Sequence, residues 1–566
     1  MTKPAPTIWI KALYPPDTAR LYRDLGYWID QTIPEFLREK CHQHKNREAV
    51  VGHTAQLATE NPGNALVRLT YHQLEQEGQA AAQRLIEQGV KPGDGVLLQV
   101  GNTVEYPIYL LGIFWAGALP IFCLPQHRHH ELLHFARKAR PTAHIFSTTA
   151  EKGTYQDAYD AYSNELRADG IAPPRIIDIS QPLSPAKNGD PDFPAGAVNT
   201  ESAYKSEHIA LLQLSGGTTG TSKLIPRSHA DYLYSVRESV KICQLTGDDR
   251  VLTVLPCAHN FTMSSPGFLG AMEAGATVVL AADPSPQTSF SLIESEKITR
   301  VALVPPLAQA WLASAQRRRP DLSSLQVMQV GGAKLLPSVA RSIMSHLDVR
   351  VQQVFGMAEG LVNYTHLQDP DDLVATRQGK PISPHDEVRI VDDHDAPVGE
   401  GAPGHLLTRG PYTIRQYFDE EYANQSSFTV DGYYRTGDIV RKYSDGYLEV
   451  TGRAKDQINR AGEKIAVDEL EELAVRHPRI HDAVALGLPD EKVGERIAMV
   501  LVPVAEKGPN PTAQEMRQHL LDCGLATFKI PEKFRTIGQL PLTNIGKISR
   551  RDLRSSLQEL FQKENK

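Results

Sequence analysis

The sequence predicts an α/β protein that carries a β-rich subdomain and ends in a small α+β unit. Two observations predict the α/β class: short apolar runs alternate with helical patterns along two stretches, and these runs repeatedly end in loops that contain Gly or Pro. A third observation, a change to shorter alternating strands after Gly379, predicts the β-rich part. The 566 residues exceed what one hydrophobic core usually serves, so we expect more than one domain.

The first α/β stretch runs from about Leu69 to Ile145, with strand candidates at Gly95–Val100 and Ile121–Leu124. The uncharged segment Tyr106–Pro125 is about as long as a membrane span, but Pro and Gly interrupt it. We therefore interpret it as a buried helix followed by a core strand. A polar segment, residues 151–206, comes next, and we expect its second half to form a surface loop.

The second α/β stretch begins at the strand candidate Ile209–Leu214. Four further candidates follow at Val251–Leu255, Thr277–Leu280, Val301–Val304 and Val327–Val330. Ligands of open α/β sheets bind beyond the carboxyl ends of strands, so we expect the chemistry in the loops after these strands. Farther along, Glu387–Val391 and Gly404–Arg409 alternate as strands of the β-rich subdomain do.

The carboxyl-terminal part has its own pattern. Helices are predicted at Val467–His477 and Pro511–Gly524, and strands at Ala483–Leu488 and Ile497–Val504. This unit of about 110 residues is large enough for a domain. We place the boundary near Lys455, which gives domains 1–454 and 455–566.

Composition excludes several classes of protein. The net charge of −7 argues against a nucleic-acid partner. The five cysteines are odd in number and lack CxxC spacing, so neither a disulfide framework nor a zinc site is indicated. The amino terminus has no continuous apolar core, so a signal peptide is not indicated, and we expect a cytoplasmic protein without a membrane span.

A glycine- and hydroxyl-rich loop, Ser215 to Lys223, directly follows the strand candidate that ends at Leu214. Glycines let backbone N–H groups converge, hydroxyls add donors, and Lys223 adds positive charge, a combination that suits phosphate oxygens. It is not the nucleoside-triphosphatase loop, because three residues rather than four separate Gly216 from Gly220. A flexible linker is the alternative, which the position after a strand disfavours.

With its continuation Leu224–His229, this loop resembles the phosphate-binding signature of the adenylate-forming superfamily, which comprises acyl-CoA synthetases, luciferases and peptide-synthetase adenylation domains. The resemblance recurs in order along nearly the whole chain, at Val354–Glu359, Gly404–Pro411, Tyr434–Asp438, Gly452–Asp456 and Pro541–Lys547. It implies a large N-terminal domain of two α/β subdomains and a β-rich subdomain, followed by a small mobile C-terminal domain. It also implies activation of a carboxylic acid as an acyl-adenylate.

The resemblance implies that ATP and Mg²⁺ are bound. Glu359 would hold Mg²⁺ with help from a hydroxyl of Thr218 or Thr219, because a hard cation prefers oxygen ligands. Asp438 would accept hydrogen bonds from the ribose, and Arg453 would contact ribose and phosphate. The alternatives are a surface carboxylate for Glu359 and a turn residue for Asp438. The other implied contacts to ATP or AMP are Ser215, Gly216, Gly217, Gly220, Lys223, Gly332, Val354, Phe355, Gly356 and Met357.

Lys547 would pass for one solvated lysine among many on composition alone. In the superfamily it resembles the lysine that bridges the substrate carboxylate and the α-phosphate during adenylation. The resemblance also gives Lys455 a catalytic part as the hinge about which the C-terminal domain rotates.

The segment Pro256–Gly267 is expected to choose the acid. Amino-acid-activating relatives carry an Asp where this chain has Asn260, and a neutral amide suits an aryl acid with a hydroxyl beside its carboxylate. The surrounding residues resemble the stand-alone aryl-acid ligases of siderophore biosynthesis, which activate 2,3-dihydroxybenzoate or salicylate. We favour 2,3-dihydroxybenzoate, because Ser265 could bond its 3-hydroxyl; Phe261 and Thr262-Met263 depart from the usual residues of that branch, so salicylate stays open.

On this resemblance His259 belongs to the catalytic residues, although a core histidine is its alternative. The implied contacts to the acid are Asn260, Phe261, Ser265, Gly331, Ala333, Lys334 and Val362.

The resemblance also implies a partner. Only 19 residues follow Lys547, too few for a carrier domain, so the expected acceptor is the phosphopantetheine thiol of a separate aryl carrier protein. The alternatives are an aryl-CoA ligase and, from another class, a non-catalytic adenylate-like sensor.

Overall fold

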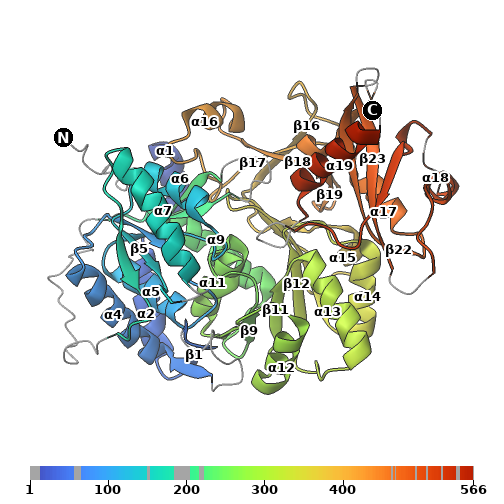
Figure 1. The fold of residues 1–566 in the computed structure, drawn as a ribbon. Helices are drawn as coiled ribbons and strands as arrows, with labels where there is room; N and C mark the ends of the chain where they lie inside the picture. Colours follow the sequence, from blue (N-terminus) through green and yellow to red (C-terminus); the bar gives the residue numbers. More distant parts are fainter. Residues whose placement is uncertain are drawn as a thin grey trace.

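The structure is a computed structural model in which four β-sheets and their helices build the molecule (Figure 1). It describes residues 13–55, 66–149, 153–183, 204–215, 222–460, 463–465, 467–490, 494–504, 508–523, 525, 527–542 and 548–564. None of the helices in these ranges is long and apolar enough to cross a membrane.

The largest sheet has nine strands, and its centre is parallel. Antiparallel strands close both edges, as is common for large sheets of α/β proteins. In spatial order the strands are β15 (Lys380–Pro381), β14 (Val362–Tyr364), β13 (Arg350–Gly356), β12 (Val327–Gly331), β11 (Arg300–Leu303), β9 (Arg250–Thr253), β10 (Thr277–Leu280), β1 (Glu48–Gly52) and β2 (Val67–Thr70).

The second sheet has six strands, parallel except for the antiparallel pair that ends it. Its order is β6 (Arg175–Asp178), β5 (Ala143–Phe146), β3 (Gly95–Leu98), β4 (Leu119–Phe122), β7 (Ile209–Leu214) and β8 (Leu224–Ser228). The hairpin β7–β8 flanks the glycine-rich loop, so this loop leaves the carboxyl end of a buried strand, as expected.

Helices cover both large sheets. One hydrophobic cluster joins side chains of α5, α9 and α11 to strands of both sheets, for example β3 and β10. The helix α9 begins with a capping box in which Ser228 and Asp231 satisfy each other's backbone N–H groups. The helices before the C-terminal unit are α1 (Pro16–Asp24), α2 (Ile33–Gln43), α4 (Tyr71–Glu87), α5 (Glu105–Trp115), α6 (His129–Ala139), α7 (Thr154–Ala168), α9 (His229–Cys243), α10 (Asn260–Ser264), α11 (Gly267–Ala274), α12 (Pro286–Glu296), α13 (Pro305–Arg318), α14 (Pro337–Leu347), α15 (Asp371–Thr376) and α16 (Glu421–Ser427).

A four-stranded antiparallel sheet forms the β-rich part, in the order β16 (Glu387–Val391), β17 (Gly404–Arg409), β18 (Tyr434–Lys442) and β19 (Leu448–Arg453). A short 3₁₀ helix, Ala454–Asp456, directly follows β19.

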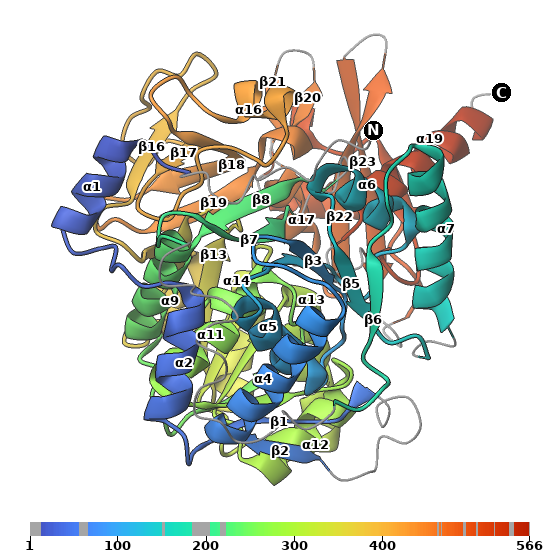
Figure 2. The ribbon, with the colours of Figure 1, turned by 90° about the vertical axis from the view of Figure 1, so that its left-hand side faces the viewer.

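The chain then enters a five-stranded sheet of β21 (Glu463–Ile465), β20 (Ile458–Arg460), β23 (Gly494–Pro503), β22 (Ile480–Asp490) and β24 (Lys533–Thr536). With this sheet lie α17 (Val467–Ala474), α18 (Ala513–Asp522) and α19 (Arg550–Glu564), drawn in orange and red at the right of Figure 1 and largely behind the rest of the molecule in Figure 2. Two hydrophobic clusters lie wholly within residues 458–557, so this unit has its own core.

The predicted fold class is confirmed, and most predicted strands match to within a few residues. The segment Tyr106–Pro125 contains the buried helix α5 and the core strand β4, as interpreted. In the polar segment 151–206, α7 and β6 occupy the first half. The middle of its second half, residues 184–203, lies outside the described residues.

Candidate active site

The two ends of the glycine-rich loop are tied together. The backbone N–H of Ser215 donates to the carbonyl oxygen of Lys223 at 2.9 Å, and the N–H of Lys223 donates to Ser215 Oγ at 2.9 Å. The Nζ of Lys223 lies 4.3 Å from the ring centroid of Tyr417, a cation–π contact. Residues 216–221, which include the predicted contacts Gly216, Gly217, Thr218, Thr219 and Gly220, lie outside the described residues.

Glu359 occupies the loop between β13 and β14, and its side chain is buried. The Tyr417 hydroxyl donates to Glu359 Oε1 at 2.9 Å, and the Tyr417 and Tyr434 hydroxyls are 2.9 Å apart. Burial, reinforced by the Glu359 charge, raises the pKa of both phenols, so both stay neutral donors. Lys223 and Glu359, from two motifs more than a hundred residues apart in the sequence, therefore meet at the same tyrosine.

Asp438 and Arg453 face each other across β18 and β19. Arg453 Nε donates to Asp438 Oδ1 at 2.8 Å, and the Asp438 side chain is only 4% exposed against 54% for Arg453. The Asp438 charge, with a smaller contribution from Glu359, holds the pKa of Arg453 above its usual range. This pair and Glu359 thus lie close enough to share one electrostatic environment.

The short helix α10 presents the candidate acid-binding residues. His259 caps it, because its Nδ1 accepts the N–H of Phe261 at 3.2 Å. Asn260 Oδ1 accepts the Tyr232 hydroxyl at 2.9 Å and the Ser264 hydroxyl at 3.2 Å. His259 therefore has a structural task here, whatever its part in the chemistry.

Gly331 is the last residue of β12 and lies where β12, β13 and α10 approach one another closely. A Cβ at this position would lie 2.7 Å from the carbonyl oxygen of Val354 and 3.2 Å from Phe261 Cε1. A side chain would therefore clash with the backbone of β13, and the absence of one brings the Phe261 ring, 7% exposed, against the strand ends. Gly331 and Phe261 thus form an apolar surface against which a flat ring could pack.

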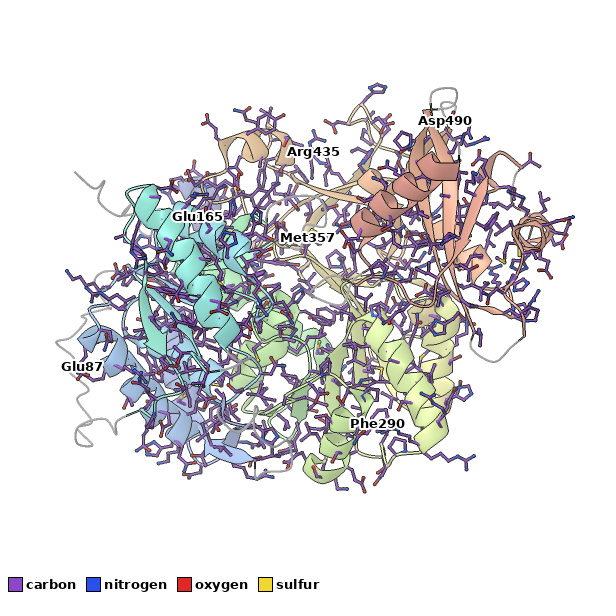
Figure 3. The ribbon with its side chains drawn as sticks, in the orientation of Figure 1. Glu87, Glu165, Phe290, Met357, Arg435 and Asp490 are labelled. Atoms are coloured by element: carbon purple, nitrogen blue, oxygen red, sulfur yellow. The ribbon has the colours of Figure 1, made fainter. Side chains whose placement is uncertain are left out.

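Other residues of the predicted site lie in or directly after β12, β13, β14 and α10. Val362, buried, pairs with Gly356 on the neighbouring strand, and Ser265 is buried at the end of α10. Phe355 and Met357 pack on the cluster under the β-rich sheet; Met357 is labelled near the middle of Figure 3. Gly332 follows Gly331 with a positive φ of 82°.

Ala333 and Lys334 lie farther out, exposed and half-buried respectively. Burial raises the pKa of Asp468, on α17, to about 7, and the Lys334 charge is among those that oppose this shift. Lys547 lies outside the described residues, as does the side chain of Lys455, whose backbone belongs to the 3₁₀ helix.

Sequence reasoning missed Arg227, which connects these parts. Its side chain is 2% exposed; Nε pairs with Asp231 at 2.7 Å, and Nη1 donates to the carbonyl oxygen of Ala358 at 2.9 Å. Its guanidinium lies 4.9 Å from the ring centroid of Tyr232. The only local signal was an Arg and an Asp four residues apart at a helix start.

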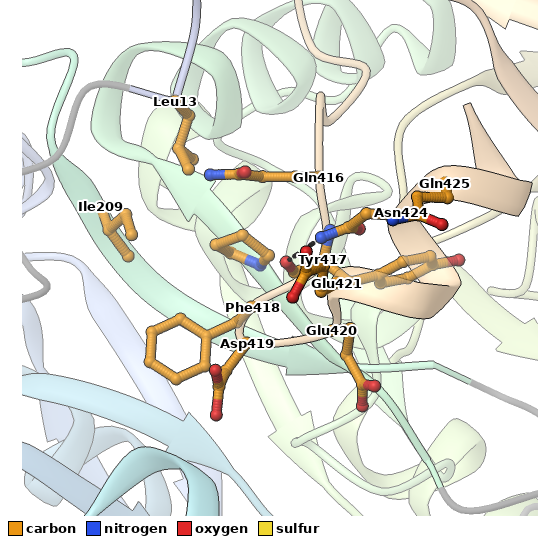
Figure 4. A pocket seen from close by; sticks show the side chains of 11 residues that line it. Leu13, Ile209, Gln416, Tyr417, Phe418, Asp419, Glu420, Glu421, Asn424 and Gln425 are labelled. Carbon is orange, nitrogen blue, oxygen red and sulfur yellow. Dashed lines mark hydrogen bonds between the residues drawn. The ribbon is translucent and has the colours of Figure 1, made fainter. Parts of the chain in front are cut away.

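A cavity of about 560 Å³ is lined in part by Tyr417, the tyrosine that contacts Lys223 and Glu359 (Figure 4). None of the predicted contacts to the acid lines this cavity, so it is distinct from the candidate acid pocket. In the part of the chain that the structure describes, no three His, Cys, Asp or Glu side chains gather as a metal site.

Comparison with known proteins gives a consistent result. A family described as "AMP-binding enzyme" matches residues 37–418, and "AMP-binding enzyme C-terminal domain" matches residues 469–547. The chain is 42% identical to the 2,3-dihydroxybenzoate-AMP ligase of Bacillus subtilis, over 96% of this chain and 97% of that protein. It is 41% identical to the salicyl-AMP ligase / salicyl-S-ArCP synthetase of Mycobacterium tuberculosis, over 95% and 93%. The apo structure of Mycobacterium smegmatis MbtA matches with a TM-score of 0.68 and 38% identity, over 97% and 99% of the two chains.

Proposed function

Because the chain belongs to the AMP-binding enzyme family, we propose that it uses ATP to activate an aryl acid, 2,3-dihydroxybenzoate, as aryl-AMP with release of pyrophosphate. In a second step it transfers the aryl group to the phosphopantetheine thiol of an aryl carrier protein, within siderophore biosynthesis and in the cytoplasm.

The residues of the candidate acid pocket are the main support for this proposal. Asn260 offers a neutral amide where an Asp would pair with an amine, and the Phe261 ring lies against the close approach at Gly331. The relatives bear both 2,3-dihydroxybenzoate and salicyl names, and Ser265, buried at the end of α10, supports the former by offering a hydroxyl for the 3-position. A site built to bond a hydroxyl discriminates against the analogue that lacks it.

For the nucleotide, we assign the ribose hydroxyls to Asp438 and a ribose and phosphate contact to Arg453. We assign the phosphates to the loop whose ends Ser215 and Lys223 hold together. The adenine end of the nucleotide would contact Gly332 and residues Val354–Met357 at the end of β13. Two contacts support this assignment: Lys223 and Glu359 meet at Tyr417, and Arg453 pairs with the buried Asp438.

Glu359 fits the role of a Mg²⁺ ligand, because its buried carboxylate is oriented by Tyr417 beside the phosphate loop. The ion would neutralise charge on the phosphates. We expect Glu359→Gln to lower adenylation by roughly a hundredfold, since metal stabilisation of transition-state charge is worth several kcal/mol, and to raise the Mg²⁺ concentration required. ATP–pyrophosphate exchange across a Mg²⁺ titration measures both.

Glu421→Gln is the matched control, because Glu421 is an exposed carboxylate at the start of α16. An unchanged Mg²⁺ requirement in Glu359→Gln would remove the residue from the metal site.

The proposal as a whole is tested by ATP–pyrophosphate exchange over a panel of benzoates. We expect 2,3-dihydroxybenzoate to give the highest kcat/KM. A salicylate optimum would favour the salicylate alternative, faster transfer to coenzyme A than to a carrier protein would favour an aryl-CoA ligase, and exchange with no aryl acid would favour the non-catalytic sensor.

The division into domains 1–454 and 455–566, with Lys455 as a hinge, is part of this proposal. It is supported by the separate cores of the two parts and by the short 3₁₀ helix at 454–456. Lys455→Pro should stiffen the hinge and reduce thioester formation more than adenylation, because rotation is required only between the two steps. Single-turnover assays of each half-reaction measure the difference.

Lys455→Ala is the control for that variant, because it removes the side chain without restricting the backbone. Equal loss of both half-reactions in Lys455→Pro would count against a hinge at this residue.

A further inference from the structure

We propose that Tyr232, held by Gln213, is a positioning residue that turns the Asn260 amide so that its NH₂ group faces the aryl acid. The pocket thereby selects an acid whose ortho substituent accepts a hydrogen bond. This inference rests on the proposed function and goes beyond it by naming the residues that set the polarity of the pocket.

The direction of the hydrogen bonds follows from their chemistry. Gln213 Nε2 lies 3.2 Å from the Tyr232 hydroxyl, and an amide nitrogen can only donate, so the phenol oxygen accepts this bond. The single hydrogen of the phenol is then directed to Asn260 Oδ1, 2.9 Å away. Gln213 and Tyr232 are 2% and 0% exposed, so water does not compete for these groups.

Ser264 adds a weaker contribution to this orientation. Its hydroxyl lies 3.2 Å from both Asn260 Oδ1 and the backbone carbonyl oxygen of Asn260, so its one hydrogen is divided between two acceptors and the Tyr232 hydroxyl is the main donor to Oδ1. The two ends of an Asn side chain have nearly the same shape, and only hydrogen bonds distinguish one orientation from the other. With Oδ1 turned toward Tyr232 and Ser264, Nδ2 points to the other side of the side chain.

The Tyr232 ring is itself fixed. The buried Arg227 guanidinium lies 4.9 Å from its centroid and is held by Asp231. The hydroxyl that orients Asn260 is therefore attached to a ring with little freedom to move.

An NH₂ donor at this position separates two acids of equal size. In 2-hydroxybenzoate the phenol hydrogen bonds to the neighbouring carboxylate, so the phenol oxygen is left to accept from outside. In 2-aminobenzoate one amine hydrogen makes that internal bond, and the second points outward and would oppose the Asn260 NH₂. Two donors that face each other leave both unsatisfied, which disfavours the amine.

The test compares these two acids as substrates in ATP–pyrophosphate exchange. Tyr232→Phe removes the hydroxyl and keeps the ring, so the amide gains freedom to rotate and can present Oδ1 to the amine. We expect the ratio of kcat/KM for 2-hydroxybenzoate to that for 2-aminobenzoate to fall about five- to tenfold, the effect of one hydrogen bond. Gln213→Leu should lower the ratio in the same direction by a smaller factor.

Tyr234→Phe is the matched control. Tyr234 lies on the same helix, is 4% exposed, and its hydroxyl is 2.7 Å from Ser383 Oγ, so the variant loses one buried hydrogen bond elsewhere. Its ratio should stay at the value of the unsubstituted protein.

An unchanged ratio in Tyr232→Phe, an equal loss with both acids, or the same fall in Tyr234→Phe would overturn the inference. If Tyr232→Phe does not fold, Gln213→Leu decides by the same ratio. Absence of exchange with every benzoate in the unsubstituted protein would instead overturn the proposed function, so the two failures are distinguishable.

Discussion

Replacement of Lys547 by Ala should lower aryl-adenylate formation by roughly a hundredfold or more, the usual cost of one preorganised electrostatic group. The reason is the charge that develops on the α-phosphate as the carboxylate attacks it, which a lysine bridging the two groups would stabilise. ATP–pyrophosphate exchange and single-turnover formation of aryl-AMP measure the loss. Transfer of the aryl group from preformed aryl-AMP to a thiol should be spared, because this step has no α-phosphate attack.

Lys529→Ala provides the control, because Lys529 lies on the same C-terminal unit with its Nζ 2.7 Å from Glu469. Loss of less than about threefold in the adenylation step of Lys547→Ala would remove this lysine from the proposed chemistry. Equal loss in both half-reactions would indicate damage to the domain rather than to the adenylation step.

Asn260→Asp should be the most damaging change in the acid pocket, with a loss of roughly a hundredfold or more in kcat/KM for 2,3-dihydroxybenzoate. One carboxylate oxygen can still accept from Tyr232 and Ser264. The other replaces the NH₂ donor by a negative charge, which would face the ortho oxygen of the substrate and repel both this oxygen and the carboxylate beside it. Steady-state exchange kinetics measure the loss.

An acid that carries an ammonium group distinguishes repulsion from misfolding. Asn260→Asp should discriminate less against such an acid than the unsubstituted protein does, since the new charge attracts the cation. If 2,3-dihydroxybenzoate keeps its kcat/KM in this variant, Asn260 does not contact the acid.

Much of the fold could be predicted because apolar runs bounded by Gly or Pro coincide with core strands. Ile209–Leu214, Thr277–Leu280 and Gly404–Arg409 match β7, β10 and β17 residue for residue. Glu387–Val391 also matches β16, and the ends of the other predicted strands shift by one to several residues, because the partner strand decides where the ladder of hydrogen bonds stops. The order of strands could not be predicted: β1 pairs with β10 across more than two hundred residues, and no local pattern encodes that choice.

The residues of the candidate site also fall into two groups, those that the sequence predicts and those that it does not. Gly331, Glu359 and Asp438 were found because they belong to recognisable motifs, and the structure places Gly331 at the end of β12, Glu359 in the loop after β13 and Asp438 within β18. Tyr417, Tyr434 and Tyr232 were not predicted as site residues, because the part that a tyrosine plays depends on which partner its hydroxyl acquires from another element. Such partners arise only when the chain has folded.

The buried Arg227 has a consequence for protein engineering. It donates to the carbonyl oxygen beside Glu359 and lies over the Tyr232 ring, so one side chain supports the walls of both candidate pockets. A library that enlarges the acid pocket by replacing that ring would disturb nucleotide binding as well and would lose active members for reasons unrelated to the acid. Diversity is better confined to positions that leave Arg227, Asp231 and Tyr232 unchanged.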